Sequence, residues 1–93
     1  MATLFKTDGT IKTVEPKNGT DFTLEELKEM VNGYIETVPT KDGSHLIVVN
    51  EEGKLEGLSY NANATVYVGE NTYLAKDDYI VGNMLVCKVQ EIQ

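Results

Sequence analysis

The segment FTLEELKEMVNG, residues 22–33, constrains the fold more than any other part of the chain. Thr23 is a predicted N-cap, because its hydroxyl can accept from the amide of Glu26 while the Glu26 carboxylate reaches back to the amide of Thr23. Phe22 and Leu27 occupy the two positions of a hydrophobic staple, which sets the direction in which the chain enters the helix. These signals predict one amphipathic helix with a well-defined first turn.

The predicted helix covers about residues 24–32. It is expected to end at Asn32-Gly33, with Gly33 in the left-handed position that follows many helices. Only one side of the helix is apolar, so that side is expected to dock on a sheet. The apolar side consists of Leu24, Leu27, Met30 and Val31.

Short β-rich runs separated by turn residues make up much of the remaining chain. Residues 2–15 predict a hairpin around Asp8-Gly9, because both residue types tolerate positive φ. Residues 45–50, HLIVVN, are apolar on both faces and predict a central strand covered on each side. Further strands are expected at 34–38, 54–58 and 83–92, with a turn at 51–53 in which Gly53 is left-handed, and with loops at 70–72 and 76–78.

A second, short helix is expected at about residues 61–68. Asn61 is its predicted N-cap and Gly69 its predicted end, although the β-branched residues inside it disfavour a helix. The sequence contains no internal repeat, low-complexity tract or linker. It predicts a single domain, 1–93, of the α+β class: a small, mostly antiparallel sheet with one main helix and this second one.

The charge of the chain excludes several classes of partner. Fifteen acidic residues against eight basic ones give a net charge of −7, and no residue is arginine. Such a surface repels phosphate, so we expect no direct nucleic-acid binding, whereas a basic partner protein fits it. No apolar run approaches the roughly 18 residues of a membrane span, and no signal peptide is recognisable. We expect a cytoplasmic protein without a membrane partner.

Residues suited to catalysis or metal binding are scarce. His45 and Cys87 are the only imidazole and thiol in the chain, and no CxxC, HExxH, GxGxxG or P-loop pattern occurs. Cys87 cannot close an internal disulfide and is interpreted as a small buried residue, with a reactive thiol as the alternative. We therefore expect a protein that is not an enzyme and that binds neither a metal nor a cofactor.

Tyrosine dominates the aromatic residues, with five tyrosines, two phenylalanines and no tryptophan. Tyrosine is favoured at interfaces because it offers a large contact area, a polar tip and few rotatable bonds. The alternative is that several tyrosines only cover the edges of a small core. The polar turn NEEG after the apolar strand is either a site or a plain connection between strands. The predicted binding surface beside it consists of Asn50, Glu51, Tyr60, Asn61 and Tyr67.

Four motifs resemble a family of short uncharacterised proteins carried by bacteriophages, plasmids and conjugative elements. They are LEEL…GYIE at residues 24–36, NEEGKL at 50–55, a Leu-x-x-Asn step at 58–61 and IVG at 80–82. Ser59 departs from the family pattern, which has proline at that position and so a more rigid turn. The resemblance implies a mobile-element gene in a bacterial cytoplasm. It implies no activity, because the family is a domain of unknown function.

Two functions of different classes fit these observations. The first is a protein–protein interaction that inhibits or modulates a host or phage factor, such as a defence system, through the acidic surface. The second is a pocket that sequesters a nucleotide-type signal between subunits. The absence of arginine disfavours the second, because only lysines and backbone amides remain to bind phosphate. A structural or housekeeping role in the mobile element, and a homo-oligomeric state, also stay open.

Overall fold

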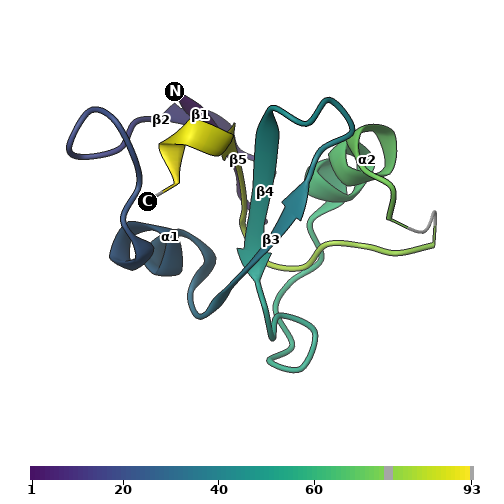
Figure 1. Cartoon of the computed structure of the whole chain (residues 1–93). Helices are drawn as coiled ribbons and strands as arrows, with labels where there is room; N and C mark the ends of the chain where they lie inside the picture. The colour runs from purple at the N-terminus through teal and green to yellow at the C-terminus, as the bar shows by residue number, and fades with distance from the viewer. Residues whose placement is uncertain (75–76, 93) are drawn as a thin grey trace.

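Two helices lie on opposite sides of a five-stranded sheet in the computed structural model, which describes residues 1–74 and 77–92 (Figure 1). The elements in chain order are β1 (Ala2–Phe5), β2 (Ile11–Val14), α1 (Leu24–Val31), β3 (Ile35–Pro39), β4 (His45–Asn50), α2 (Ala62–Asn71), β5 (Met84–Lys88) and the 3-10 helix η1 (Val89–Glu91).

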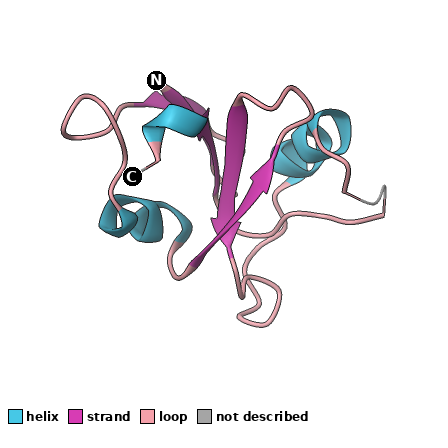
Figure 2. Cartoon of the chain, viewed as in Figure 1, coloured by secondary structure: helices cyan, strands magenta, loops and turns pink. Residues whose placement is uncertain are grey.

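The strands form one antiparallel sheet in the order β2-β1-β5-β4-β3 (Figure 2). The last strand in the sequence, β5, lies in the centre and joins the N-terminal hairpin to the β3–β4 pair. Strands β2 and β3 form the two edges. The predicted α+β class, the antiparallel sheet and the N-terminal hairpin are confirmed.

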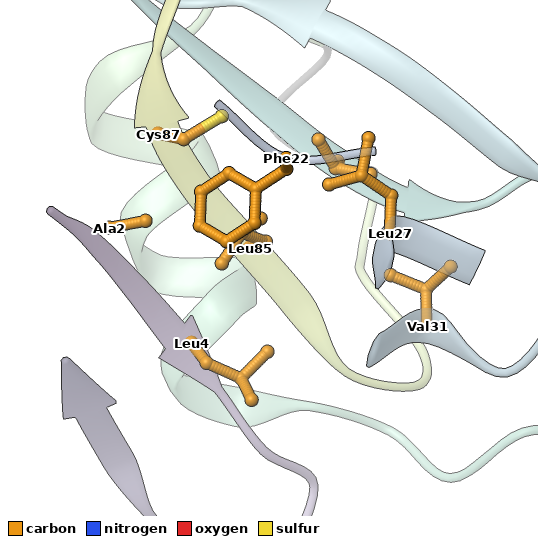
Figure 3. Packing of buried hydrophobic residues seen from close by; sticks show 8 residues of the cluster. Ala2, Leu4, Phe22, Leu27, Val31, Leu85 and Cys87 are labelled. Carbon is orange, nitrogen blue, oxygen red and sulfur yellow. The ribbon is translucent and has the colours of Figure 1, made fainter. Parts of the chain in front are cut away.

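Helix α1 covers one face of the sheet, as its sequence predicts, but Leu24, expected on the docked side, is 52% exposed. Oγ1 of Thr23 accepts from the amide of Glu26 at 3.2 Å, and Oε1 of Glu26 accepts from the amide of Thr23 at 3.1 Å. Phe22 and Leu27 are 0% and 2% exposed and pack close to Leu85 of β5 (Figure 3). The α1-side core consists of Ala2, Leu4, Phe22, Leu27, Val31, Val48, Leu85 and Cys87.

The end of α1 differs from the expectation in one residue. Asn32, not Gly33, takes the left-handed conformation, with φ 65° and ψ 38°. Asparagine tolerates this region better than most residues that carry a Cβ. Gly33 is needed for a different reason, because a Cβ there would lie only 2.8 Å from Nδ2 of Asn50.

Helix α2 covers the other face with smaller side chains. Only Ala64 and Val68 of this helix are buried, and Tyr67 is half-buried. Strand β4 supplies residues to both faces, as expected for a strand covered on each side. The α2-side core consists of Phe5, Ile47, Val49, Ala64, Val68, Ile80, Met84 and Val86.

The prediction of a strand at residues 54–58 is wrong. The chain there forms consecutive turns closed by local backbone hydrogen bonds. The side chain of Asn50 accepts from the amide of Glu52 at 2.8 Å and so bends the chain away from the strand direction. Gly57, not Gly53, has the positive φ, 68°.

The second helix extends further than predicted. Asn61 is its N-cap, but α2 continues past Gly69 to Asn71, so the loop expected at 70–72 is wrong for its first two residues. An exposed glycine costs a helix only about 1 kcal/mol. The side chain of Asn71 and both the amide and the hydroxyl of Thr72 donate to carbonyls one turn back, which stabilises the longer end.

The C-terminal strand is shorter than the expected 83–92, because β5 ends at Lys88 and the 3-10 helix η1 follows. The Glu91 carboxylate accepts from the amide of Lys88 at 2.9 Å, which bends the chain out of the strand. In the expected loop at 76–78, residues 77 and 78 are outside helix and strand, and Lys76 lies outside the described residues. No helix within residues 1–74 and 77–92 is long and apolar enough to cross a membrane.

Candidate functional site

Asn50, at the end of β4, connects three segments of the molecule and is 7% exposed. Its Nδ2 donates to the backbone carbonyl of Val31 and to Oε1 of Glu56, each at 3.1 Å. Its Oδ1 accepts from the amide of Glu52. The side chain therefore holds the end of α1 and the 51–57 turns together, and its amide is used inside the molecule.

Asn61, the N-cap of α2, is 2% exposed and is also occupied internally. Its Oδ1 accepts from the amide of Ala64 at 3.1 Å, which caps the helix. Its Nδ2 donates to the carbonyls of Phe5 at 3.0 Å and Gly82 at 2.9 Å. Asn61 thereby ties the start of α2 to the end of β1 and to the segment before β5.

The other three predicted residues lie in different surroundings. Glu51 and Tyr60 are exposed, and the Tyr60 ring lies 6.2 Å from that of Tyr79. Tyr67, on α2, packs against Phe5 with the ring centroids 5.4 Å apart, and burial raises the pKa of its hydroxyl. The five predicted residues thus do not form one continuous surface. Their role in binding stays a prediction, and the exposed members are the ones placed to meet a partner.

A cleft of about 200 Å³ opens on the α2 side of the β3–β4 pair. Its apolar part includes Val38 and Val49, which lie on the same face of neighbouring strands, and Ile80 from the segment before β5. Four carboxylates line it together with these residues. They belong to Glu36, Glu51, Glu52 and Asp78, and this site is called the acidic cleft below.

One ion pair connects two walls of the acidic cleft. Nζ of Lys54 lies 2.8 Å from Oδ1 of Asp78 and 4.2 Å from the centroid of the Tyr79 ring. The hydrogen bond between them raises the pKa of Lys54 and lowers that of Asp78. Both groups are open to solvent, which screens the attraction, so the pair adds little to stability. Its structural effect is to hold the 51–57 turns against the segment that precedes β5.

The sequence pattern identified Glu51 but missed Glu36, Lys54, Asp78 and Tyr79. Alternation along β3 is a signal that Glu36 shares a face with Val38. Lys54 and Asp78 are 24 positions apart and come together only through the tertiary fold. No local pattern marks such a pair.

The turn before β4 brings a serine, a histidine and an aspartate together without forming a catalytic triad. Oγ of Ser44 and Oδ2 of Asp42 both lie near the same nitrogen, Nδ1 of His45, at 3.3 and 3.1 Å. A triad needs the acid and the nucleophile on opposite ring nitrogens. The pKa of Asp42 is well below its usual range, because the Thr40 hydroxyl and the amide of Ser44 donate to it. The group caps a turn.

Cys87 is 1% exposed in the α1-side core, and burial raises the pKa of its thiol to about 11. A thiol with that pKa is almost wholly protonated at neutral pH, which disfavours the reactive alternative. Among the described residues, no three side chains of the His, Cys, Asp and Glu types are grouped so as to hold a metal ion.

Comparison with known proteins identifies a family for nearly the whole chain. Residues 2–92 match the family model described as Domain of unknown function (DUF3846). No curated protein and no solved structure matches the chain. The match agrees with the resemblance to an uncharacterised family, and the association with phages and plasmids stays a prediction. This chain belongs to the DUF3846 family.

Proposed function

We propose that this protein is a non-enzymatic binding protein that takes a basic part of a partner protein into its acidic cleft. The observation that carries the proposal is the combination of an apolar floor with four carboxylates in one concave site. Asp78 is paired with Lys54, whereas Glu36, Glu51 and Glu52 form no salt bridge within the described part of the chain. A cationic side chain could therefore approach Glu51 and Glu52, and share Glu36 with Lys54, while its aliphatic stem covers Val38 and Val49.

The setting of this activity follows from the family resemblance described above. We place the gene on a bacteriophage, plasmid or conjugative element and the protein in a bacterial cytoplasm. The partner is then a host or phage protein, and binding inhibits or modulates it, as an element would do with a host defence factor. A net charge of −7 favours basic partners over nucleic acid itself.

Sequestration of a nucleotide-type signal fits the acidic cleft less well. Carboxylates repel phosphate groups, and Lys54 is already paired with Asp78. A volume of about 200 Å³ is also below the roughly 300–1,000 Å³ that is typical of small-molecule pockets. A pocket shared between two subunits could be larger than this cleft. Its carboxylates would still repel the phosphate groups of a nucleotide.

The test is affinity capture from the bacterium that carries the gene, with wild type and three variants. Glu51→Lys reverses one charge of the acidic cleft, and Tyr60→Ala removes the exposed ring next to Tyr79. Glu29→Lys, the matched control, makes the same charge change on the exposed side of α1. Each variant should change the free energy of unfolding by only about 0.5 kcal/mol, which circular dichroism during urea unfolding checks.

We expect Glu51→Lys to weaken capture of one basic protein about tenfold, and Glu29→Lys to leave it unchanged. The difference should shrink between 0.1 and 1 M salt, because the screening length falls from about 10 Å to about 3 Å. Tyr60→Ala should weaken capture by a similar factor and keep its effect in high salt. Equal capture by wild type and Glu51→Lys would contradict the proposal.

A further inference from the structure

Strand β3 is an edge of the sheet whose outer side offers unpaired backbone groups. The amide of Glu51 donates to the carbonyl of Tyr34, and the amide of Thr40 donates to the carbonyl of His45. Residues of an antiparallel strand alternate between bonding to the neighbour and pointing away from it. With the register of β3 and β4, the backbone groups of Ile35 and Thr37 therefore point to the free side.

This free side is open in the described part of the chain. No backbone or side-chain hydrogen bond from residues 1–74 or 77–92 reaches Ile35 or Thr37 from that direction. Pro39 lies two residues after Thr37 and its backbone also points to the free side. Proline has no N–H, and at this position none is needed for a bond to β4. Glu36 and Thr37 are both exposed, so a second chain could approach.

The open edge and the acidic cleft are parts of one surface. Glu36 and Val38 point to the cleft face, opposite Val49 and Ile47 of β4. A strand added beside β3 would run about 4.8 Å away, with every second side chain on the same face as Glu36. Those alternate side chains would meet the carboxylates of the acidic cleft.

We propose that the edge of β3 binds a basic, extended segment of the partner protein as a sixth strand of the sheet. The inference rests on the proposed function and specifies its partner: a segment with lysine or arginine at every second position. The backbone bonds to Ile35 and Thr37 supply affinity, and the acidic cleft selects the charge, as in other cases of strand addition. A second copy of this chain is disfavoured, because it carries the same negative charge and would bring another Glu36 to the edge.

The probe is an eight-residue synthetic peptide of alternating lysine and valine, labelled for fluorescence anisotropy. Thr37→Pro removes one of the two outward N–H groups of β3, leaving that of Ile35, and does not remove an N–H that bonds to β4. Thr13→Pro is the matched control on the opposite edge, β2. The amide of Lys6 donates to the carbonyl of Thr10, so Thr10 and every second residue after it bond to β1. Thr13 falls between these residues, and its N–H therefore points outward.

We expect Thr37→Pro to weaken peptide binding at least about tenfold and Thr13→Pro to leave it unchanged. A peptide with an N-methyl group on every amide keeps the charge but has no N–H group left with which to pair as a strand. We expect wild type to bind this N-methylated peptide as weakly as Thr37→Pro binds the plain peptide. The N-methylated peptide therefore tests strand addition even where Thr37→Pro fails to fold. The amides of Ile35 and Thr37 should also exchange more slowly with solvent when the unmodified peptide is bound.

The outcomes separate this inference from the proposed function. Equal binding of the plain and N-methylated peptides, with loss in Glu51→Lys, would leave the acidic cleft as a binding site and overturn strand addition. No binding of the plain peptide at millimolar concentration would overturn strand addition as well. Dimerisation that Thr37→Pro abolishes would show that the edge takes a second copy instead. Loss of capture in Glu29→Lys but not in Glu51→Lys would contradict the proposed function itself.

Discussion

The two faces of the sheet are covered by helices of different composition, and among the described residues the acidic cleft opens on the α2 side; the α1 side is called the sealed face below. Helix α1 brings Leu27 and Val31 to its face, next to the fully buried Phe22. Helix α2 brings Ala64 and Val68, which are smaller, and leaves the acidic cleft beside β3. Both faces contribute a buried core to the fold, and the smaller side chains on the α2 side leave the cleft that we propose as the binding site.

The largest difference between the faces should appear when buried side chains are truncated. Leu27→Ala removes a side chain from the sealed face and should cost about 3–4 kcal/mol of unfolding free energy. Val68→Ala on the other face should cost about half as much, because two side-chain carbons are lost instead of three and the neighbouring cleft allows relaxation. Urea midpoints with unchanged m-values measure both. Equal losses would mean that the faces are packed alike.

Asn61→Ala should be the most damaging polar substitution on the α2 side, at about 2–3 kcal/mol. It removes the helix cap and the side-chain donor to the buried carbonyls of Phe5 and Gly82. Asn63→Ala, at an exposed position two residues later, is the control and should change stability by about 0.5 kcal/mol or less. Thermal unfolding followed by circular dichroism distinguishes them. A small effect of Asn61→Ala would show that water replaces the lost amide.

Thr23→Ala should have a smaller effect on the sealed side, about 1 kcal/mol, through loss of the bond to the amide of Glu26. Thr23→Ser keeps a hydroxyl at the N-cap and should recover most of that loss. Denaturant unfolding of the three proteins measures the difference. Identical midpoints for wild type and Thr23→Ala would mean that the hydroxyl does not stabilise the start of α1.

The pH dependence of stability provides a further test of the same helix end. The amides of Lys17 and Thr23 donate to the Glu26 carboxylate and lower its pKa from the ordinary value of 4.5. The stabilisation is therefore complete above about pH 4.5 and is lost as the pH falls through the lower folded-state pKa. Glu26→Gln should show a shallower loss of stability than wild type below pH 4.5. Parallel pH profiles would contradict this assignment.

The local elements were predictable from the sequence because their signals are local. Thr23 and Glu26 are three positions apart, so the start of α1 could be predicted without knowledge of the rest of the fold. The strand at 45–50 was equally clear, since a short apolar run bounded by turn residues is typical of a strand buried on both faces. The 54–58 segment misled because it follows a hairpin-length turn at 51–53, whereas the side chain of Asn50 bends the chain into further turns.

The candidate site was less predictable because it depends on contacts between distant segments. Glu51 was identified from its position in a polar turn. Asn61 was correctly assigned as an N-cap, and that role already implied a side chain occupied by the backbone rather than offered to a partner. Glu36 and Asp78 reach the same cleft only through the pairing of β3 with β4 and the path of the chain before β5. Neither contact can be predicted from a short stretch of the sequence.

The position of Asn50 has a mechanical consequence for the whole molecule. One amide group contacts both the last carbonyls of α1 and the turns that wall the acidic cleft. Ordering of those turns by a bound partner would consequently tighten the end of the helix on the opposite face. By thermodynamic reciprocity, any change that loosens this helix end would weaken the partner's hold by the same free energy. A substitution at the end of α1, on the sealed face, would then change the affinity of the acidic cleft on the other face.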